Sequence, residues 1–191
     1  MRPIISNWKV YGLEESIAAS KYSFSTNPDD CTPEITKTVL RLAQSPAGSG
    51  EDNFLNGIIA QFDLTFSQLI WPQAQRYHWL DFVTSMSKMH MAMKLDIEEQ
   101  CNEYVYESTK RQLKHDIEKY NECPSEEMFY LVAYNIPLGF TLTARMTTNY
   151  RQLKGIYAQR RKHKMKEWRE FCEFIEKEFP HSEFFTGKAA E

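Results

Sequence analysis

The segment from Phe140 to Ile175 constrains the fold most, because it joins one alternating stretch to two amphipathic stretches without a break. Residues 141–147 alternate between polar and apolar side chains, which predicts a half-buried β-strand. Thr148 or Asn149 then offers a side-chain oxygen that can cap the first turn of a helix. The pattern therefore predicts a strand that leads directly into a helix.

Two amphipathic helices are predicted in this segment. The apolar face of the first helix is formed at helical spacing by Met146, Tyr150, Leu153 and Tyr157. The second helix is predicted from about Lys166 to Phe179, and its apolar face is formed by Met165, Trp168, Phe171, Cys172 and Ile175. Pro180 ends this second helix, because proline has no amide hydrogen to donate.

The first helix and the residues after it contain a dense cluster of positive charge. Its members are Arg145, Arg151, Arg160, Arg161, Lys162, His163, Lys164 and Lys166. Such a cluster is either a solvated helix face or an anion site built from guanidinium groups and a helix N-terminus. Both interpretations remain open at this point. If there is a site, its size and charge suit a nucleotide.

The composition limits the classes of protein to which the chain can belong. The net charge is −3, so a general nucleic-acid-binding surface is not expected, and any anion site must be local. The hydrophobic content of 42% and the aromatic content of 14% are typical of a folded globule. We expect one domain over residues 1–191, with a flexible tail after about residue 186.

The cysteines and the apolar stretches indicate the cellular compartment. The four cysteines lack CxxC spacing, and no pair of closely spaced ligands suggests zinc. No signal peptide and no apolar run near 18 residues is visible, so we expect a cytoplasmic protein that does not contact a membrane. The methionine-rich run 86–93 around His90 is interpreted as flexible packing in preference to a copper site.

The remaining patterns predict a mixed α+β fold with a small, mostly antiparallel sheet wrapped by helices. Strands are predicted over 4–11 and 58–66, and residues 82–87 are either a strand or an extended loop that contains serines. Helices are predicted over 13–22, 32–44, 71–79, 108–120 and 125–135. The helix start at 32 rests on Thr32, Pro33 and Glu34, which suit a cap, a first helical position and a first turn. The small-residue loop 45–50 is either a connector or a loop that turns amide groups toward a phosphate.

No catalytic set is recognisable. Ser85, Ser87 and His90 are close in sequence, but nothing indicates an orienting acid or an oxyanion hole. The chain instead offers arginines that could hold phosphates and aromatic rings that could stack on a base. Those rings are Trp71, Tyr77, Trp79, Tyr150 and Tyr157. These residue types favour binding over turnover.

The order of these motifs resembles the C-terminal half of flavin-dependent thymidylate synthases. In this chain a strand is followed by NYRQL at the start of a helix, by an arginine, and by a histidine and EWR at the start of another helix. In the family a comparable Asn-x-Arg-x-x-Leu helix leads to an arginine and then to a His-Ala-Gln-Trp-Glu-Ile-Arg segment. The resemblance implies that Asn149 and Arg151 lie near flavin or nucleotide and that Arg160 lies at the nucleotide phosphate. It also implies that Glu167 and Arg169 match the final segment of the family motif.

The first half departs from the pattern of that family. The Gly-His loop of the family corresponds here to residues 50–53, which contain no histidine. The Arg-His-Arg signature is replaced by residues 75–78, and the closing Arg-Tyr has become Met89 and His90. The loss of charged groups that polarise the pyrimidine damages catalysis more than binding.

The chain is also similar to small proteins of phages of Gram-positive bacteria that end in a comparable NYxxLxxIYxQRRxHKxxEWxxFCxWIE pattern. Together these resemblances suggest a phage nucleotide-binding protein, without catalysis or a bound cofactor, in the cytoplasm of the host bacterium. It would sequester a host nucleotide immune signal, of ADP-ribose or cyclic-nucleotide type, in a pocket between the subunits of a homo-dimer or homo-tetramer. The expected ligand-binding residues are Arg76, His78, Ser85, Ser87, His90, Arg145, Asn149, Tyr150, Arg151, Tyr157, Arg160 and Arg161.

Two other hypotheses remain. One is an active flavin-dependent enzyme that methylates a pyrimidine, with FAD as its cofactor. The other is a structural or protein-interaction module in which the cationic cluster is a solvated face. Binding of DNA or RNA is the weakest alternative, because the chain has a net negative charge.

Overall fold

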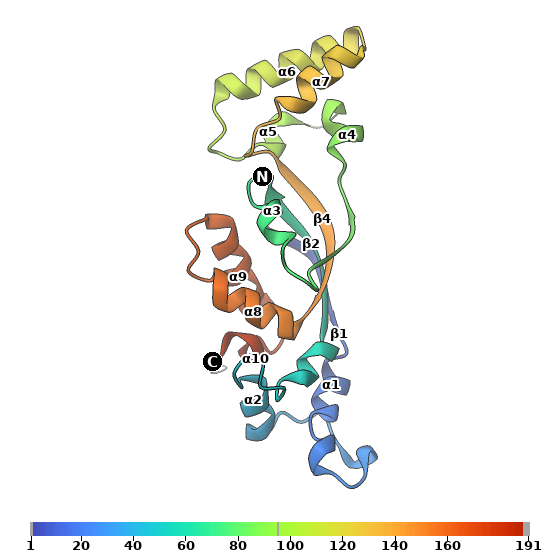
Figure 1. The fold of residues 1–191 in the computed structure, drawn as a ribbon, viewed down its shortest axis with the longest axis vertical. Helices are drawn as coiled ribbons and strands as arrows, with labels where there is room; N and C mark the ends of the chain where they lie inside the picture. Colours follow the sequence, from blue (N-terminus) through green and yellow to red (C-terminus); the bar gives the residue numbers. More distant parts are fainter. Residues whose placement is uncertain (1, 95, 189–191) are drawn as a thin grey trace.

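A four-stranded antiparallel sheet forms the centre of the molecule, in a computed structural model that describes residues 2–94 and 96–188 (Figure 1). The strand order is β1-β2-β4-β3. The strands are β1 (Ile5–Tyr11), β2 (Ile59–Ser67), β3 (Asp81–Ser85) and β4 (Thr141–Asn149). The long central pair is in continuous register from Ile59 opposite Asn149 to Ser67 opposite Thr141. The predicted α+β class with a small antiparallel sheet is confirmed.

The helices lie between the strands in the chain and after the last strand. They are α1 (Leu13–Ala19), α2 (Lys37–Ala43), α3 (Trp71–Ala74), α4 (Lys88–Met91), α5 (Ile97–Gln100), α6 (Glu107–Glu122), α7 (Glu126–Tyr134), α8 (Tyr150–Arg160), α9 (Lys166–Glu178) and α10 (Glu183–Thr186). Short 3₁₀ turns cover Tyr22–Phe24, Pro28–Asp30, Asn53–Gly57 and Ala92–Lys94. None of the helices in the described ranges is long and apolar enough to cross a membrane.

The main hydrophobic core lies between one face of the sheet and helices α8 and α9 (Figure 1). Phe66 of β2 packs edge-on against Trp168 of α9, with 4.9 Å between the ring centroids. Trp168 and Phe171 are fully buried, so the predicted apolar stripe of the second helix is the face that meets the sheet. This packing fixes the direction in which α8 leaves the end of β4.

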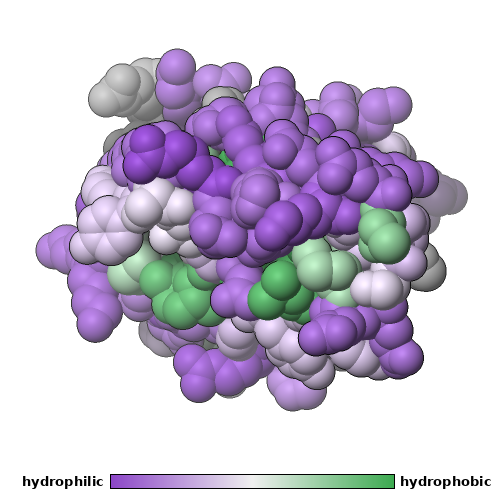
Figure 2. Space-filling model, turned by 90° about the horizontal axis from the view of Figure 1, so that it is seen from above, coloured by the Kyte–Doolittle hydropathy of each residue, from purple (hydrophilic) through white to green (hydrophobic). Residues whose placement is uncertain are grey.

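A smaller core lies at the far end of the molecule, where α6 and α7 form a hairpin (Figure 1). It consists of Ile97, Cys101, Leu113, Ile117, Val132 and Phe140. Seen from above, this end is mostly hydrophilic, with hydrophobic side chains gathered in two places (Figure 2). Ser125 caps α7 through its hydroxyl, which accepts the amide of Met128 at 3.2 Å.

The other face of the sheet is polar. Arg145 of β4 donates to the carbonyl oxygen of Asn7 at 2.6 Å and lies 3.3 Å from the carboxylate of Asp63 on β2. Asn7 adopts a left-handed conformation with φ 48°, at a bulge in β1 between Ser6 and Lys9. The bulge brings the Asn7 amide within 2.7 Å of Asp63, so these three side chains lock β1, β2 and β4 together.

Some predicted boundaries are wrong. Helix α2 begins at Lys37, not at 32, because the hydroxyl of Thr36 caps it by accepting the amide of Val39 at 3.3 Å. Met146 lies in strand β4 and not on the first helix. The helix at 71 ends at Ala74, and the short helices α5 and α10 were not predicted. The tail predicted after 186 includes residues 189–191, which lie outside the described residues.

A close approach of two glycines joins helix α1 to the turn that precedes β2. Gly12 has φ 69°, and a Cβ atom at this position would lie 2.5 Å from the carbonyl oxygen of Gly57. A Cβ at Gly57 would in turn lie 2.4 Å from the hydroxyl of Ser16. The contact therefore requires glycine at both positions.

Candidate functional site

The largest cavity with converging polar groups lies where β4 runs into α8. Its volume is about 920 Å³, within the range of small-molecule sites. The small-residue loop after α2 and helix α8 both contribute to its walls. The lining residues are Gln44, Ser45, Pro46, Ala47, Gly48, Asp52, Asn56, Ile59, Trp79, Asn149, Arg151, Gln152, Lys154, Gly155 and Ala158.

Asp52 is the buried charge at the base of this cavity. Its side chain is 1% exposed and meets two cations, with Lys154 Nζ at 2.8 Å and Arg151 Nε at 3.1 Å. The contact with Arg151 is an ion pair without hydrogen-bond geometry, so Oδ1 of Asp52 accepts no hydrogen bond within the described residues. One carboxylate between two cations leaves a net positive charge.

Lys154 belongs to the scaffold of the cavity. Its ammonium donates to the carbonyl oxygens of Ala43 at 2.7 Å and Ser45 at 2.6 Å, in addition to Asp52. All three of its hydrogens are therefore used to hold the end of α2 and the start of the loop against α8. The remaining positive charge is accordingly that of Arg151.

Arg151 is the cation of this trio that can reach a ligand. Its side chain is 33% exposed, and Asp52 contacts only its Nε atom. The two terminal nitrogens make no hydrogen bond or ion pair with any residue in the ranges 2–94 and 96–188. A guanidinium held at Nε in this way can present its two other nitrogens to a phosphate.

The loop opposite Arg151 adds backbone donors. Gly48 and Gly50 have φ angles of 87° and 81°, which glycine adopts without strain. Ala47 and Gly48 line the cavity, and their amides have no acceptor among the residues that the structure describes. Two neighbouring amides without a partner, in residues that line the same cavity as a guanidinium, suit an anion.

Asn149 and Trp79 complete the cavity. Asn149 caps α8, because its Oδ1 accepts the amide of Gln152 at 2.9 Å. The helix therefore begins at the cavity, with the positive end of its dipole directed there. Trp79 is 67% exposed and has φ 65°, a strained conformation that holds a large ring at the rim.

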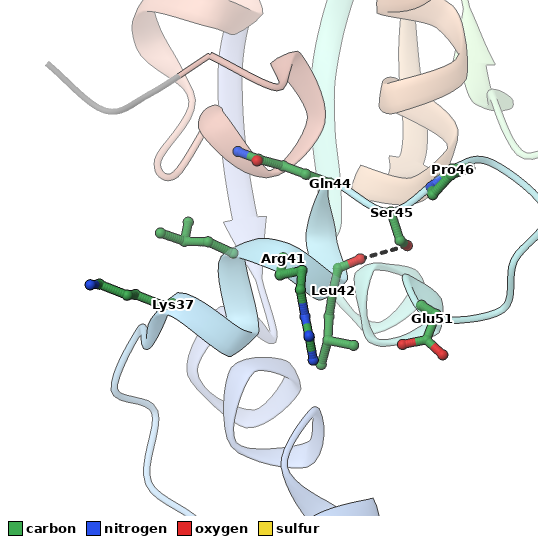
Figure 3. Close-up of a pocket in the computed structure, with 8 residues that line it drawn as sticks. Lys37, Arg41, Leu42, Gln44, Ser45, Pro46 and Glu51 are labelled. Carbon is green, nitrogen blue, oxygen red and sulfur yellow. Dashed lines mark hydrogen bonds between the residues drawn. The ribbon is translucent and has the colours of Figure 1, made fainter.

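The same loop borders a second, more open hollow of about 630 Å³ on its other side (Figure 3). Figure 3 shows that Lys37 and Arg41 extend from α2 in different directions and that the hydroxyl of Ser45 bonds to the Leu42 carbonyl, at 2.8 Å. Two exposed cations that point apart do not converge on one ligand. This hollow is therefore a weaker candidate than the cavity at α8.

The structure separates the predicted cationic cluster into four places. Arg145 lies on the open face of the sheet and Arg151 at the cavity. Arg160 donates from Nε to Tyr77 at 2.7 Å and from Nη1 to Gln73 at 3.2 Å, and its guanidinium lies 4.7 Å from the ring centre of Trp168. Arg161 is exposed beside the ring of Tyr157. The cluster in the sequence is not one anion site in this chain.

Two of the predicted aromatic contacts lie in the core instead. Tyr150 is fully buried, and its hydroxyl donates to the carbonyl of Pro180 at 2.6 Å. Tyr157 is 3% exposed, and its hydroxyl donates to Glu176 at 2.6 Å. Because both rings are packed inside the protein, neither can stack on a base that enters from solvent.

The predicted residues around β3 are not at the cavity. Arg76 and His78 are exposed between α3 and β3. Ser85 lines a smaller cavity of about 250 Å³, and Ser87 is half-buried just beyond it. The backbone of His90 belongs to α4, and its side chain lies outside the described part of the structure. Only Asn149 and Arg151 of the predicted set line the large cavity.

The sequence prediction missed Asp52 and Lys154, and it named Trp79 only as one of five possible stacking rings. An aspartate two residues after a small-residue loop is a weak signal, because most such residues are solvated. Groups of three or more residues that could hold a metal ion are absent from the described ranges.

Comparison with known proteins identifies the fold. No protein-family model and no curated protein sequence matches the chain. Among solved structures, a flavin-dependent thymidylate synthase ThyX from Helicobacter pylori, complexed with FAD and dUMP, matches with a TM-score of 0.68 and 13% identity over 97% of both chains. A second structure of that enzyme, with FAD and dUMP, matches with a TM-score of 0.69 and 13% sequence identity, over 96% of this chain and 95% of the other.

A related enzyme is also similar. The UMP/dUMP methylase PolB from Streptomyces cacaoi, bound with 5-Br UMP, matches with a TM-score of 0.60 and 12% identity, over 92% of this chain and 88% of the other. These identities are too low to transfer an activity. They show that the chain has the fold of flavin-dependent thymidylate synthases, as its motif order suggests.

Proposed function

We propose that this protein binds a nucleotide in the cavity between the small-residue loop 45–50 and α8 and holds it without turnover. The observation that carries the proposal is that one cavity of about 920 Å³ is lined by Arg151, whose terminal nitrogens are free, and by Ala47 and Gly48, whose amides have no acceptor among the described residues. These groups suit a phosphate or diphosphate. Trp79 at the rim offers a flat surface on which a base can stack.

The residues of the cavity favour binding over catalysis. Those that line it in the described structure include no histidine and no cysteine. Its one serine, Ser45, donates its hydroxyl to the carbonyl of Leu42 and so is not paired with a base. The one carboxylate, Asp52, is held between two cations, and a general base must instead be free to take a proton.

The biological role that fits such a site is sequestration of a nucleotide signal. We propose a phage protein that retains an ADP-ribose-type or cyclic nucleotide of the host immune response, because tight binding alone is enough for that role. A second copy of the chain would cover the open side of the cavity in a homo-oligomer. Support for the nucleotide comes from the cavity, and support for the phage role comes from the sequence pattern.

An active flavin enzyme is the second candidate, favoured by the extent of the fold similarity, which covers 97% of the chain. In that case FAD would occupy the same cavity, with Arg151 and the loop amides at its pyrophosphate. The residues present fit that group, because Asn149 and Arg151 line the cavity. Bound FAD would supply redox chemistry that no side chain of the cavity provides.

Mass spectrometry of the small molecules released by denaturing the purified protein, together with its visible spectrum, separates the two candidates. Release of an intact ADP-ribose-like or cyclic nucleotide, without flavin, is the result expected for sequestration. Release of flavin from a yellow protein would instead support the enzyme. If neither is released and added nucleotides do not bind, the protein is a structural or interaction module.

A further inference from the structure

A second enclosed cleft lies at the other end of the two central strands. The candidate nucleotide cavity includes Ile59 and Asn149, whereas this cleft includes Thr65, Ser67 and Thr141. The two sites are therefore separated by most of the length of β2 and β4, about 20 Å at 3.3 Å per residue. The cleft has a volume of about 520 Å³.

Hydroxyl groups form the floor of this cleft. Thr65, Ser67 and Thr141 are each at most 7% exposed. Ser67 donates its hydroxyl to Glu167 at 3.0 Å, and Thr141 donates its hydroxyl to the carbonyl oxygen of Gln100 at 2.9 Å. Each oxygen retains lone pairs, so the floor can accept hydrogen bonds from hydroxyl groups of a ligand.

The acidic side chains of the cleft all have partners in the chain. Glu167 accepts the amide of Ser67 at 2.7 Å as well as its hydroxyl. Glu103 and Glu170 lie on either side of Lys166, at 3.3 and 3.4 Å. These contacts fasten the first turn of α9 to the end of β2 and neutralise part of the negative charge. Glu167 keeps its negative charge, because its partners are neutral, but the four cations that line the cleft outnumber its three carboxylates.

The remaining basic side chains of the cleft have no acidic partner among the residues that the structure describes. They are Arg2, Lys164 and Arg169. Arg2 contacts only the sulfur of Met86, and Arg169 donates to the carbonyl oxygens of residues 163 and 164. Carbonyl contacts leave the charge of a guanidinium uncompensated. The cleft thus combines a hydroxyl floor with three unpaired cations.

We propose that this cleft binds a small phosphorylated molecule that carries several hydroxyl groups, of the sugar-phosphate class. The cations hold the phosphate, because charge-assisted hydrogen bonds are the strongest that these side chains make. The buried hydroxyl groups accept from the sugar. This site is separate from the nucleotide cavity and does not depend on the function proposed for it.

The test is titration calorimetry with ribose 5-phosphate, glucose 6-phosphate, ribose and inorganic phosphate. The expected result is that at least one sugar phosphate binds more tightly than ribose or inorganic phosphate. Lys164→Gln combined with Arg2→Gln should weaken that binding by about tenfold or more. Both side chains are exposed, so their replacement should leave the fold intact. Arg41→Gln, which removes an exposed cation from α2, is the matched control.

Several results would overturn the proposal. One is that neither sugar phosphate binds. Another is that inorganic phosphate binds as tightly as the sugar phosphates, which would show that the buried hydroxyl groups do not contact the sugar. A third is unchanged affinity in the Arg2 and Lys164 double variant. Loss of binding in Arg151→Gln would place the ligand in the nucleotide cavity and would equally contradict a separate site.

Discussion

The positive charge available to a ligand in the candidate cavity depends on how the Asp52 carboxylate is divided between Lys154 and Arg151. Lys154 and Arg151 approach different oxygens of its carboxylate, at 2.8 and 3.1 Å. Because Lys154 compensates Asp52, the charge of Arg151 remains available for an anion. A chain with Arg151 alone beside Asp52 would have a neutral cavity.

Replacement of Lys154 by methionine tests whether this side chain holds the loop against α8. Lys154→Met removes hydrogen bonds to Ala43, Ser45 and Asp52, so the free energy of unfolding should fall by about 2–4 kcal/mol. Urea denaturation measures the change. Lys37→Met, at an exposed position on α2, should change stability by less than about 0.5 kcal/mol. Equal stability of the two variants would show that Lys154 does not hold the loop.

His163 should make the stability depend on pH. Burial, together with the charges of Arg160, Lys164 and Arg169, lowers the pKa of His163 below its usual value. The neutral ring accepts the amide of Met165 at 3.2 Å. The unfolded chain therefore takes up the proton more readily, and the free energy of unfolding should decrease as the pH falls below about 6.5.

Urea denaturation at pH values from about 7.5 to 5.5 measures this dependence. His163→Gln should flatten it, whereas His78→Gln, which changes an exposed ring, should leave it as in the natural chain. If the slope is the same in both variants, the ring of His163 does not contribute.

At the scale of single elements, helix α8 could be predicted almost completely from the sequence. The cap at Asn149 and the buried Leu153 follow from local pattern, and both are confirmed. Helix α2 shows the opposite case. The Thr32-Pro33-Glu34 pattern suits a helix start, but the helix begins at Lys37, because the hydroxyl of Thr36 caps it. Two local capping signals compete there, and the sequence pattern alone does not rank them.

Gly155 makes α8 a direct test of the cavity. A Cβ atom at this position would meet nothing within 4 Å, and the residue lines the cavity. Gly155→Ala should stabilise the protein by about 0.5–1 kcal/mol, because glycine is unfavourable inside a helix. Gly155→Leu should keep a stable helix but extend into the cavity and weaken nucleotide binding. Thermal unfolding and calorimetry measure the two effects, and equal nucleotide affinity in both variants would contradict the site.

At the scale of the whole molecule, the sequence predicts more of the fold than of the candidate site. Alternation and helical spacing report on each segment separately, so they identify the strands and the two C-terminal helices. The cavity depends on the contact between Asp52 and Lys154, which are far apart in the sequence. No local pattern encodes that contact, and the arginines that are close in sequence point to different parts of the molecule.

The similarity in fold extends over the whole chain, whereas the chemistry of the site rests on a few side chains. Flavin-dependent thymidylate synthase ThyX and this chain share an architecture at 13% identity. Such a fold can keep its cavity while the residues around it change. A chain with this fold can therefore bind a ligand without the activity of the enzymes that it resembles.

The most direct measurement is isothermal titration of ADP-ribose, a cyclic dinucleotide and FAD into the natural chain and into Arg151→Gln. The account predicts that at least one of these nucleotides binds the natural chain and that its affinity falls about tenfold or more in Arg151→Gln. Arg41→Gln, which removes the same charge outside the cavity, should bind as the natural chain does. Absence of binding by all three nucleotides, or equal affinity in Arg151→Gln, would contradict a nucleotide site in this cavity.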